Sequence, residues 1–300
     1  MEEIKEIKSV TIVPFTLMSS SISAVLGLIY ALILIIVLGL VAVFLPSTAK
    51  AIVGMLLTSA VALILILPVG SFLLSIMSSF LLAFIYNLLV PRVGGIKLGI
   101  VDMKEVRSLP VIPLSLMVSI LYTIFTFLIT LIVAPILMLV LQGAAVASLS
   151  ASSSMPELSG LGALGIIGII MMIIGIPIMV FIATFIYSAL TALFYNFLAP
   201  QMGGVRFKFS QVKDNLFEIK KIKPVPLALI GAVVLTIVNF IFNIPQIIVY
   251  LAVREPLIAI GYVLGNIVGY FIFYFIICAL TALLYNFLRP TIGAVELELE

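Results

Sequence analysis

This chain of 300 residues has no histidine, no tryptophan and one cysteine, and only 9% of its residues are charged. Without histidine it lacks the commonest general base, the commonest zinc ligand and the usual proximal haem ligand. The single Cys278 excludes an internal disulfide and a cysteine metal cluster. Soluble domains are roughly 25% charged, so a chain that is 64% hydrophobic is predicted to be an integral membrane protein without cofactor or metal.

Ionisable side chains are also missing from the middle of every long apolar run. Such residues inside a membrane are the usual mark of proton relays and ion-coupled transport. Their absence argues against a pump, a transporter with a charged site, and a membrane protease of the metal or aspartyl type. Ser71, Ser75, Ser78 and Ser79 form a polar stripe, but no base accompanies them, so we expect no enzyme activity.

What the chain does contain is one phrase written three times: Tyr-Asn, a few apolar residues, Pro, and a pair of small residues. It closes apolar stretches at residues 86–95, 195–204 and 285–294. The entry to each repeat also recurs, at Pro14, Pro113 and Pro226. A unit repeated in tandem sets the architecture, so we divide the chain into repeats 1–100, 101–210 and 211–300 of one integrated membrane domain.

Short alternating runs flank each apolar stretch. Alternation at period two is typical of half-buried strands, and these runs cover residues 7–12, 96–100, 105–109, 205–209, 217–223 and 295–299. Each repeat is therefore strand, helix, external segment, helix, strand, and hairpins through 101–104 and 213–215 join neighbouring repeats.

The first strand (2–13) and the last strand (294–300) have no partner next to them in the sequence. An unpaired strand leaves an open edge, so we expect these two to pair and close a ring. Opposite charges on facing strands favour this pairing, with Glu296, Glu298 and Glu300 opposite Lys5 and Lys8.

The second apolar stretch of repeat one, residues 51–90, is too long for one crossing. As a helix it would measure about 60 Å, roughly twice the hydrocarbon thickness. Pro68 with Gly70 predicts a helix break at 67–71, and Gly175 with Pro177 predicts another at 175–177. Residues 51–66 and 160–174 are then extracytoplasmic interfacial or re-entrant helices, and the Ala- and Ser-rich residues 143–160 a flexible external loop.

Basic residues cluster on one side of this topology. Two lie in the N-terminal strand, four in 91–110, six in 200–225 and one in the C-terminal tail, which leaves only Lys50 and Arg254 of the 15 elsewhere. The positive-inside rule places these clusters in the cytoplasm. The predicted fold is an α-helical, multi-pass protein of the cell membrane with a small cytoplasmic β part. Its six transmembrane helices form three two-span repeats in a pseudo-threefold arrangement, with both termini cytoplasmic.

One packing pattern recurs in the second helix of each repeat. A small residue, an alanine and the asparagine are spaced by four, so they share one helix face. Small residues let membrane helices approach closely. Cys278 occupies the position that serine has in the other repeats, so we interpret it as a packing residue and not as a nucleophile. The three sets are Ser79, Ala83, Asn87; Ser188, Ala192, Asn196; and Cys278, Ala282, Asn286.

The repeated phrase itself allows two interpretations. The asparagines could line a polar path, but we favour a helix cap or helix contact. Their tyrosine neighbours, close to basic residues, suit an interfacial aromatic belt. The glycines suit a turn with positive φ and not a phosphate cradle. The residues concerned are Tyr86, Asn87, Gly94, Gly95, Tyr195, Asn196, Gly203, Gly204, Tyr285, Asn286 and Gly293.

The repeat resembles the two-span membrane domain of unknown function found in actinobacterial proteins. The resemblance rests on Tyr-Asn with the following glycines in all three copies, and on Thr16 and Ser115 two residues after the starting proline. This chain departs from that pattern by triplicating the unit and by lacking a Lys soon after the starting Ser. The resemblance implies a module without an assigned activity.

We therefore expect a non-enzymatic membrane scaffold or interaction protein, with the cytoplasmic strands as the surface for protein partners. The alternative is a pore or channel around the pseudo-threefold axis, lined by Ser and Asn. Lys220, Lys221 and Lys223 form a basic cluster that either attracts anionic membrane lipid or only sets topology. We expect no nucleic-acid partner.

Overall fold

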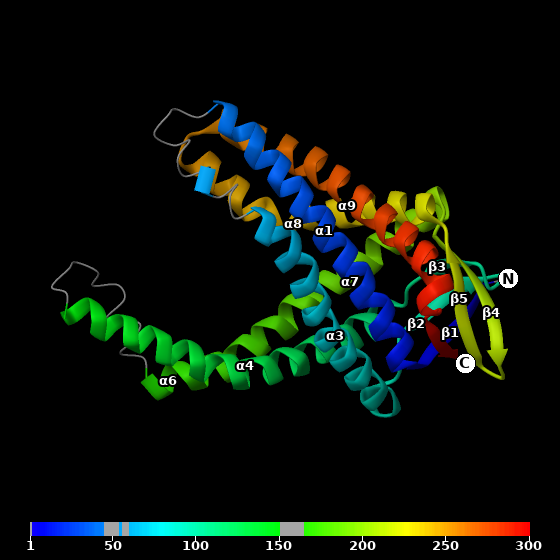
Figure 1. Cartoon of the computed structure of the whole chain (residues 1–300). Helices are drawn as coiled ribbons and strands as arrows, with labels where there is room; N and C mark the ends of the chain where they lie inside the picture. Colours follow the sequence, from blue (N-terminus) through cyan, green and yellow to red (C-terminus); the bar gives the residue numbers. More distant parts are fainter. Residues whose placement is uncertain (1, 45–53, 56–59, 151–164) are drawn as a thin grey trace.

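The computed structural model describes residues 2–44, 54–55, 60–150 and 165–300 (Figure 1). Its long helices come in three antiparallel pairs. The first pair is α1 (Ile12–Phe44) and α3 (Ala60–Val93). The second is α4 (Val111–Ser150) and α7 (Ile176–Met202), the latter preceded by α6 (Gly165–Ile170) and a π-helical turn η1 (Met171–Gly175). The third is α8 (Pro224–Ala252) and α9 (Pro256–Ile292).

Among the described residues, six helices are long and apolar enough to cross a membrane. Large apolar side chains lie exposed along their outer faces, as at Ile132 (68% exposed) and Leu257 (83% exposed). Surfaces of this kind are stable in lipid, where an apolar side chain does not need to be buried against protein. The prediction of a mostly helical protein is confirmed at this level, with helices long and apolar enough to cross a membrane and a small antiparallel β part.

Six short strands form a closed antiparallel barrel at one end of the helices (Figure 1). Strand order follows the chain: β1 (Glu2–Val10), β2 (Lys97–Val101), β3 (Glu105–Ser108), β4 (Val205–Lys213), β5 (Leu216–Ile222) and β6 (Glu296–Leu299). The predicted hairpins join β2 to β3 and β4 to β5. The two terminal strands also pair, with Val10 opposite Leu297, which closes the ring as expected.

The charges at this closure differ from the prediction. Lys8 does pair with Glu300, at 3.2 Å, but Lys5 lies 3.8 Å from Glu3 on its own strand. Lys5 lies opposite Leu98 of β2, in the part of β1 that does not pair with β6, so it does not face the remaining acids of β6. Their partners are hydroxyls, Ser9 for Glu298 and Thr11 for Glu296. The predicted first strand, 2–13, was also too long, since α1 already starts at Ile12.

Neither predicted helix break occurs. Pro68 lies inside α3, which runs unbroken from Ala60 to Val93, so residues 60–66 belong to that helix. Membrane helices tolerate proline because neighbouring groups and local adjustments satisfy the freed backbone atoms. Before Pro177, the π-helical turn η1 absorbs the missing hydrogen bond. Residues 165–174 thus continue into α7, whereas 51–53, 56–59 and 160–164 lie outside the described residues.

The predicted flexible loop at 143–160 is wrong over its first half. Helix α4 continues to Ser150. Alanine has the highest intrinsic helix propensity, and three alanines between Gly143 and Ser148 favour continuing the helix. The remaining part of that predicted loop, from residue 151, falls outside the described residues.

The buried core consists of three clusters at the junction of helices and barrel. Each cluster joins the second helix of one pair, the adjoining strands and the first helix of the next pair. The first helix contributes Met18, Met117 or Ile230, each 1% exposed. Contacts between pairs follow the same order: α3 with α4, α7 with α8, and α9 with α1. The core therefore fixes the barrel onto all three helix pairs.

Candidate functional site

The three repeated tyrosines bind the barrel backbone. Each hydroxyl donates to a strand carbonyl at 2.5–2.7 Å and accepts an N–H at 2.9–3.1 Å. The side chains are 4–6% exposed, so they are not the interfacial belt that we predicted. A buried tyrosine hydroxyl needs a hydrogen-bond partner, and the barrel supplies two. The triads of carbonyl, tyrosine and N–H are Ile7, Tyr86, Ile96; Val106, Tyr195, Val205; and Ile219, Tyr285, Val295.

The three asparagines bind the point where a strand gives way to a helix. Each amide accepts the N–H and donates to the C=O of one residue, at 2.7–2.9 Å. Asn87 holds Val10, Asn196 holds Leu109 and Asn286 holds Ile222. Val10 and Ile222 are the last residues of β1 and β5, and Leu109 directly follows β3, so each amide satisfies backbone groups at a strand end. The contact is neither a helix cap nor a helix–helix bond.

A glutamate completes each of these joints, and the sequence reasoning missed all three. Glu6, Glu105 and Glu218 each stand one residue before the carbonyl that the tyrosine binds. Glu6 accepts the Gly95 N–H at 2.7 Å, and Glu105 accepts that of Gly204 at 3.0 Å. The recurring order glutamate, apolar residue, basic residue was a readable signal. We call each set of tyrosine, asparagine and glutamate a corner joint.

Hydrogen bonding keeps two of these glutamates ionised. The Gly95 amide lowers the pKa of Glu6, against the opposing effect of burial, and Lys8 at 3.4 Å adds to the lowering. For Glu105, burial acts to raise the pKa, but the Gly204 amide and Arg206, at 2.8 Å, outweigh it. The net pKa of Glu105 is therefore also lowered. Glu218 lies 3.1 Å from Arg289.

The paired glycines have two different structural roles. The first of each pair, Gly94, Gly203 or Gly293, has φ of 87°, 87° or 104°, as predicted for the turn between helix and strand. The second does not need a positive φ. A side chain at Gly95 or Gly204 would instead overlap the strand carbonyl that accepts the tyrosine hydroxyl.

The small-residue face of each second helix is buried. Ala83, Ala192 and Ala282 are 0–3% exposed. Ser79 and Ser188 turn their hydroxyls to carbonyls of their own helices. Cys278 lies against Gly231 of α8, where an added methyl would meet its Sγ at 3.0 Å. These positions thus lie in helix packing, away from any cluster of reactive groups among the described residues.

The first helices bury a matching row of small side chains. Ser20, Ser119 and Ala232 stand six residues after the starting prolines, and each is 0% exposed. Ser20 and Ser119 hydrogen-bond to carbonyls of their own helices. Water therefore has no access to these faces.

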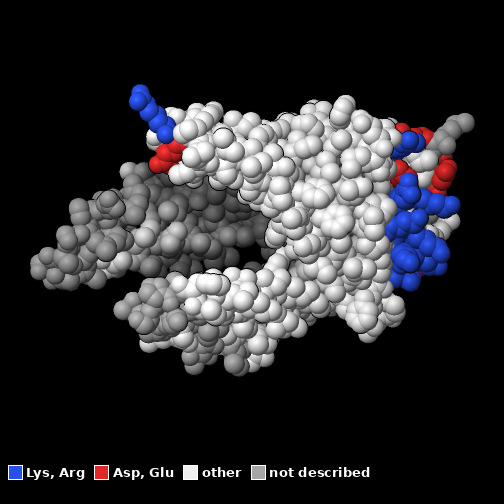
Figure 2. All heavy atoms as spheres, turned by 90° about the horizontal axis from the view of Figure 1, so that it is seen from above, with Lys and Arg blue, Asp and Glu red and all other residues white. Residues whose placement is uncertain are grey.

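Charged side chains collect on the barrel. Apart from Arg254 and Glu255, between α8 and α9, every charged residue that the structure describes lies in the barrel or next to it (Figure 2). In Figure 2 the lower part of that end is basic, and the upper part shows acidic groups beside basic ones. Most of the acidic residues belong to β1 and β6, which carry Glu2, Glu3, Glu6, Glu296 and Glu298.

The predicted basic cluster is split between two environments. Lys220 lies 3.9 Å from Glu218, the glutamate of a corner joint. Lys221 and Lys223 instead line a hollow next to the first turn of α8. A second hollow beside it adds Lys104, from the turn between β2 and β3, and Arg206 of β4, and both hollows contain Lys208.

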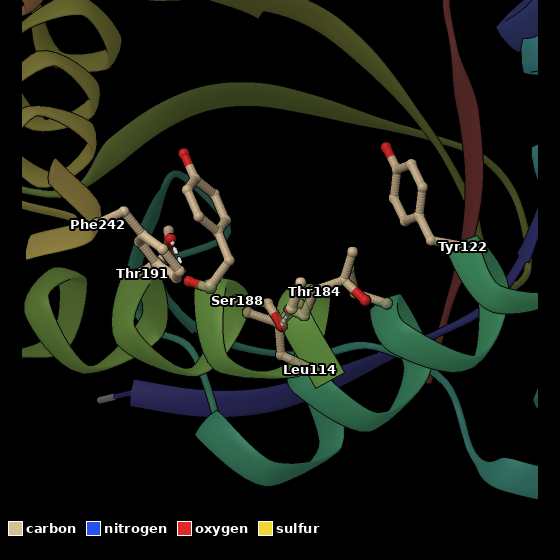
Figure 3. A pocket seen from close by; sticks show the side chains of 9 residues that line it. Leu114, Tyr122, Thr184, Ser188, Thr191 and Phe242 are labelled. Atoms are coloured by element: carbon tan, nitrogen blue, oxygen red, sulfur yellow. Dashed lines mark hydrogen bonds between the residues drawn. The ribbon is translucent and has the colours of Figure 1, made fainter. Parts of the chain in front are cut away.

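A groove of about 560 Å³ lies among α4, α7 and α8 (Figure 3). Among its polar lining groups, Thr184, Ser188 and Thr191 donate their hydroxyls to carbonyls of α7. The hydroxyls of Tyr122 and Tyr187 also line the groove, and that of Tyr187 accepts from Asn239 at 3.5 Å. Leu114 and Phe242 supply apolar surface. The groove therefore offers few free polar groups and suits an acyl chain more than a polar ligand.

A polar chain unique to the third helix pair was also missed. Asn239 donates to Tyr274 at 2.8 Å, and Asn243 accepts from Tyr262 at 2.6 Å. Asn266 donates to the carbonyl of Tyr262 at 2.7 Å. Amides inside an apolar run are visible in the sequence, but the tyrosine partners of Asn239 and Asn243 lie on the other helix. Such bonds hold membrane helices together.

Among the described residues, no group of three or more Cys, Asp or Glu side chains could hold a metal ion. Comparison with protein-family models, curated proteins and solved structures finds no match for this chain. The functional argument therefore rests on the corner joints and on the charged surface of the barrel.

Proposed function

We propose that this chain is a membrane scaffold that holds a rigid, charged barrel at the cytoplasmic surface for protein partners, without catalytic activity. The observation that carries this proposal is the corner joint, whose tyrosine and asparagine form the same bonds in all three copies. Three joints fix the orientation of the barrel relative to the membrane helices. Pre-organised surfaces bind partners at a lower entropic cost.

The proposal includes a pseudo-threefold arrangement of repeats 1–100, 101–210 and 211–300. It is supported by the cyclic order of helix contacts, by the three equivalent core clusters and by the closure of β1 on β6. The resemblance to the two-span actinobacterial domain belongs to the same proposal, with this chain as three fused copies.

The proposed orientation places the barrel and both termini in the cytoplasm, because the basic residues gather there. Labelling of single cysteines in a Cys278→Ser background tests it. A membrane-impermeant maleimide applied to intact cells should label Arg254→Cys, between α8 and α9, and leave Asp214→Cys unlabelled. Labelling of Asp214→Cys from outside would reverse the topology.

Crosslinking tests the scaffold role directly. The closed barrel leaves no free strand edge among the described strands, so partners must bind its side-chain surface. A photo-crosslinker at Asp214, on the β4–β5 turn, should give a discrete adduct in cells. The same crosslinker at Leu264, an outward apolar position that is 59% exposed, is the control and should give only diffuse lipid adducts. Repeated absence of an adduct from barrel positions would contradict the scaffold.

The pore remains the competing proposal. Water conduction along the first helices would require an open face, whereas Ser20, Ser119 and Ala232 are fully buried. This burial favours the scaffold. Proteoliposomes loaded with a small fluorescent ion indicator should show no flux above protein-free vesicles, and a flux proportional to protein content would favour the pore.

A further inference from the structure

We propose that the barrel carries a binding site for the phosphate of an anionic lipid headgroup, where β3, β4 and the start of α8 meet. We call it the basic hollow and define it by Lys104, Arg206, Lys208 and Lys223. It comprises two neighbouring hollows of about 470 Å³ and 410 Å³, which share Phe207, Lys208 and Lys223.

The backbone fixes these cations side by side. Phe207 donates its N–H to the carbonyl of Lys104 at 2.7 Å, and Lys223 donates to the carbonyl of Arg206 at 3.0 Å. Two backbone hydrogen bonds thus hold together the three segments that carry Lys104, Arg206 and Lys223. Their approach is a property of the barrel and does not depend on a ligand.

Most of this positive charge has no counter-charge. Arg206 pairs with Glu105 at 2.8 Å. Lys104, Lys208 and Lys223 make no ion pair with any residue that the structure describes, although Asp102 also lines the hollow. Unpaired ammonium groups around a concavity attract a phosphate.

The two equivalent junctions of the barrel lack this arrangement. Positions at the three junctions can be matched by counting along the chain from the backbone residues that each corner joint binds. The positions of Lys104, Arg206, Lys208 and Lys223 are occupied at the first junction, in the same order, by Lys5, Lys97, Gly99 and Pro110. At the third they correspond to Phe217, Glu296, Glu298 and Thr11. All three junctions keep the tyrosine, asparagine and glutamate, so the fold does not require four cations. Their concentration at one junction indicates a binding role.

An apolar surface next to the cations indicates that the phosphate belongs to a lipid. Pro224, Val225 and Pro226 line the second hollow, and Val225 is 66% exposed. Helix α8, which is apolar enough to cross the membrane, begins at the same place. A headgroup phosphate in the hollow therefore leaves the acyl chains along α8. Inorganic phosphate has no acyl chain that could contact this apolar surface.

Lipid retention in native mass spectrometry tests the site on the purified full chain in neutral detergent. The probes are phosphatidylglycerol, phosphatidylcholine and inorganic phosphate. The test variant is Lys208→Gln with Lys223→Gln. The matched control, Lys5→Gln with Lys97→Gln, removes the same charge at the first junction, and Lys208→Arg with Lys223→Arg keeps the charge. Circular dichroism checks that each variant is folded.

We expect wild-type protein to retain phosphatidylglycerol in preference to phosphatidylcholine. The test variant should lose about 30-fold in apparent affinity, since each cation near an anionic surface contributes a factor of about five. The control and the arginine variant should stay within about threefold of wild type. Equal retention of both lipids, an equal loss in the control, or a loss in the arginine variant would overturn the site.

Displacement of phosphatidylglycerol by millimolar inorganic phosphate would assign the hollow to a soluble anion and overturn the lipid assignment. This inference is separate from the scaffold role, because lipid retention needs no protein partner. The Asp214 crosslinking experiment therefore succeeds or fails independently of it.

Discussion

Removing one tyrosine hydroxyl tests the corner joint most directly. In Tyr195→Phe the ring stays in place, but Val205 loses the acceptor of its N–H at 2.9 Å and the carbonyl of Val106 loses its donor at 2.5 Å. Tyr195 is 6% exposed and Val106 4% exposed, so water cannot replace the hydroxyl easily. The matched control is Tyr122→Phe, because Tyr122 is 42% exposed and its hydroxyl has no partner among the described residues.

The expected cost follows from the groups left unpaired. A buried donor or acceptor without a partner costs about 1–3 kcal/mol. Tyr195→Phe leaves one donor and one acceptor unpaired, and structural relaxation relieves part of the cost. We therefore expect this variant to lose about 2–4 kcal/mol of stability at the joint. Because 1.4 kcal/mol is a factor of ten, opening of this joint should become roughly 30-fold to 900-fold more frequent. The control should change by less than about 0.5 kcal/mol.

Hydrogen exchange with mass spectrometry, in detergent, measures this opening locally. Peptides that contain the amide of Val205 should exchange faster in Tyr195→Phe. The amides of Ile96 and Val295 should keep their protection, because Tyr86 and Tyr285 still bind them. Unchanged exchange at Val205 would refute the joint. An equal increase at all three amides would show global destabilisation and refute its local action.

Three further predictions follow from the packing, the closure and the charges. Ala192→Leu should lower the free energy of unfolding by about 1–3 kcal/mol through overpacking, because Ala192 is 0% exposed. Leu193→Ala, at a position that is 52% exposed, should lower it less. Thermal unfolding in detergent compares the two variants, and equal losses of stability would contradict the packing at Ala192. Deleting residues 294–300 removes β6 and should make β1 sensitive to protease, whereas continued resistance would argue against its role in closure. Because the pKa values of Glu6 and Glu105 lie below the ordinary 4.5, their stabilising contribution is full above pH 4.5 and disappears as the pH falls through the lowered values. Denaturation curves measured from pH 6 to 3 should therefore show that Glu105→Gln loses less stability on acidification than wild type. An unchanged dependence of stability on pH would exclude Glu105 as a contributor to the acid-induced loss.

The repeats explain why so much of the architecture could be predicted. Alternation at period two marked the strands, long apolar runs marked the helices, and the tandem phrase indicated how they recur. The pairing of β1 with β6 followed because two strands alone lacked a neighbour, and the structure confirms it. The lysines of β1 were harder to place, because Lys5 lies in the part of β1 that pairs with β2 and forms its ion pair with Glu3 of its own strand.

Helix continuity could not be predicted in the same way. Proline removes one hydrogen bond, and whether this breaks a helix depends on what the surroundings can absorb. Around Pro68 the helix continues, and before Pro177 a π-helical turn takes up the defect. The sequence contains the proline but not this compensation.

The amino-acid sequence by itself determined the long apolar helices and the positions of the strands, because these depend on local periodicity and on composition. Only the tertiary structure decided what the repeated residues do. Tyr86 binds a carbonyl 79 positions away, and Asn87 an amide 77 positions away. Lys104, Arg206 and Lys223 meet only because the barrel pairs their strands. Contacts of this kind depend on ring closure, which brings distant segments within hydrogen-bond distance, and no local pattern records them.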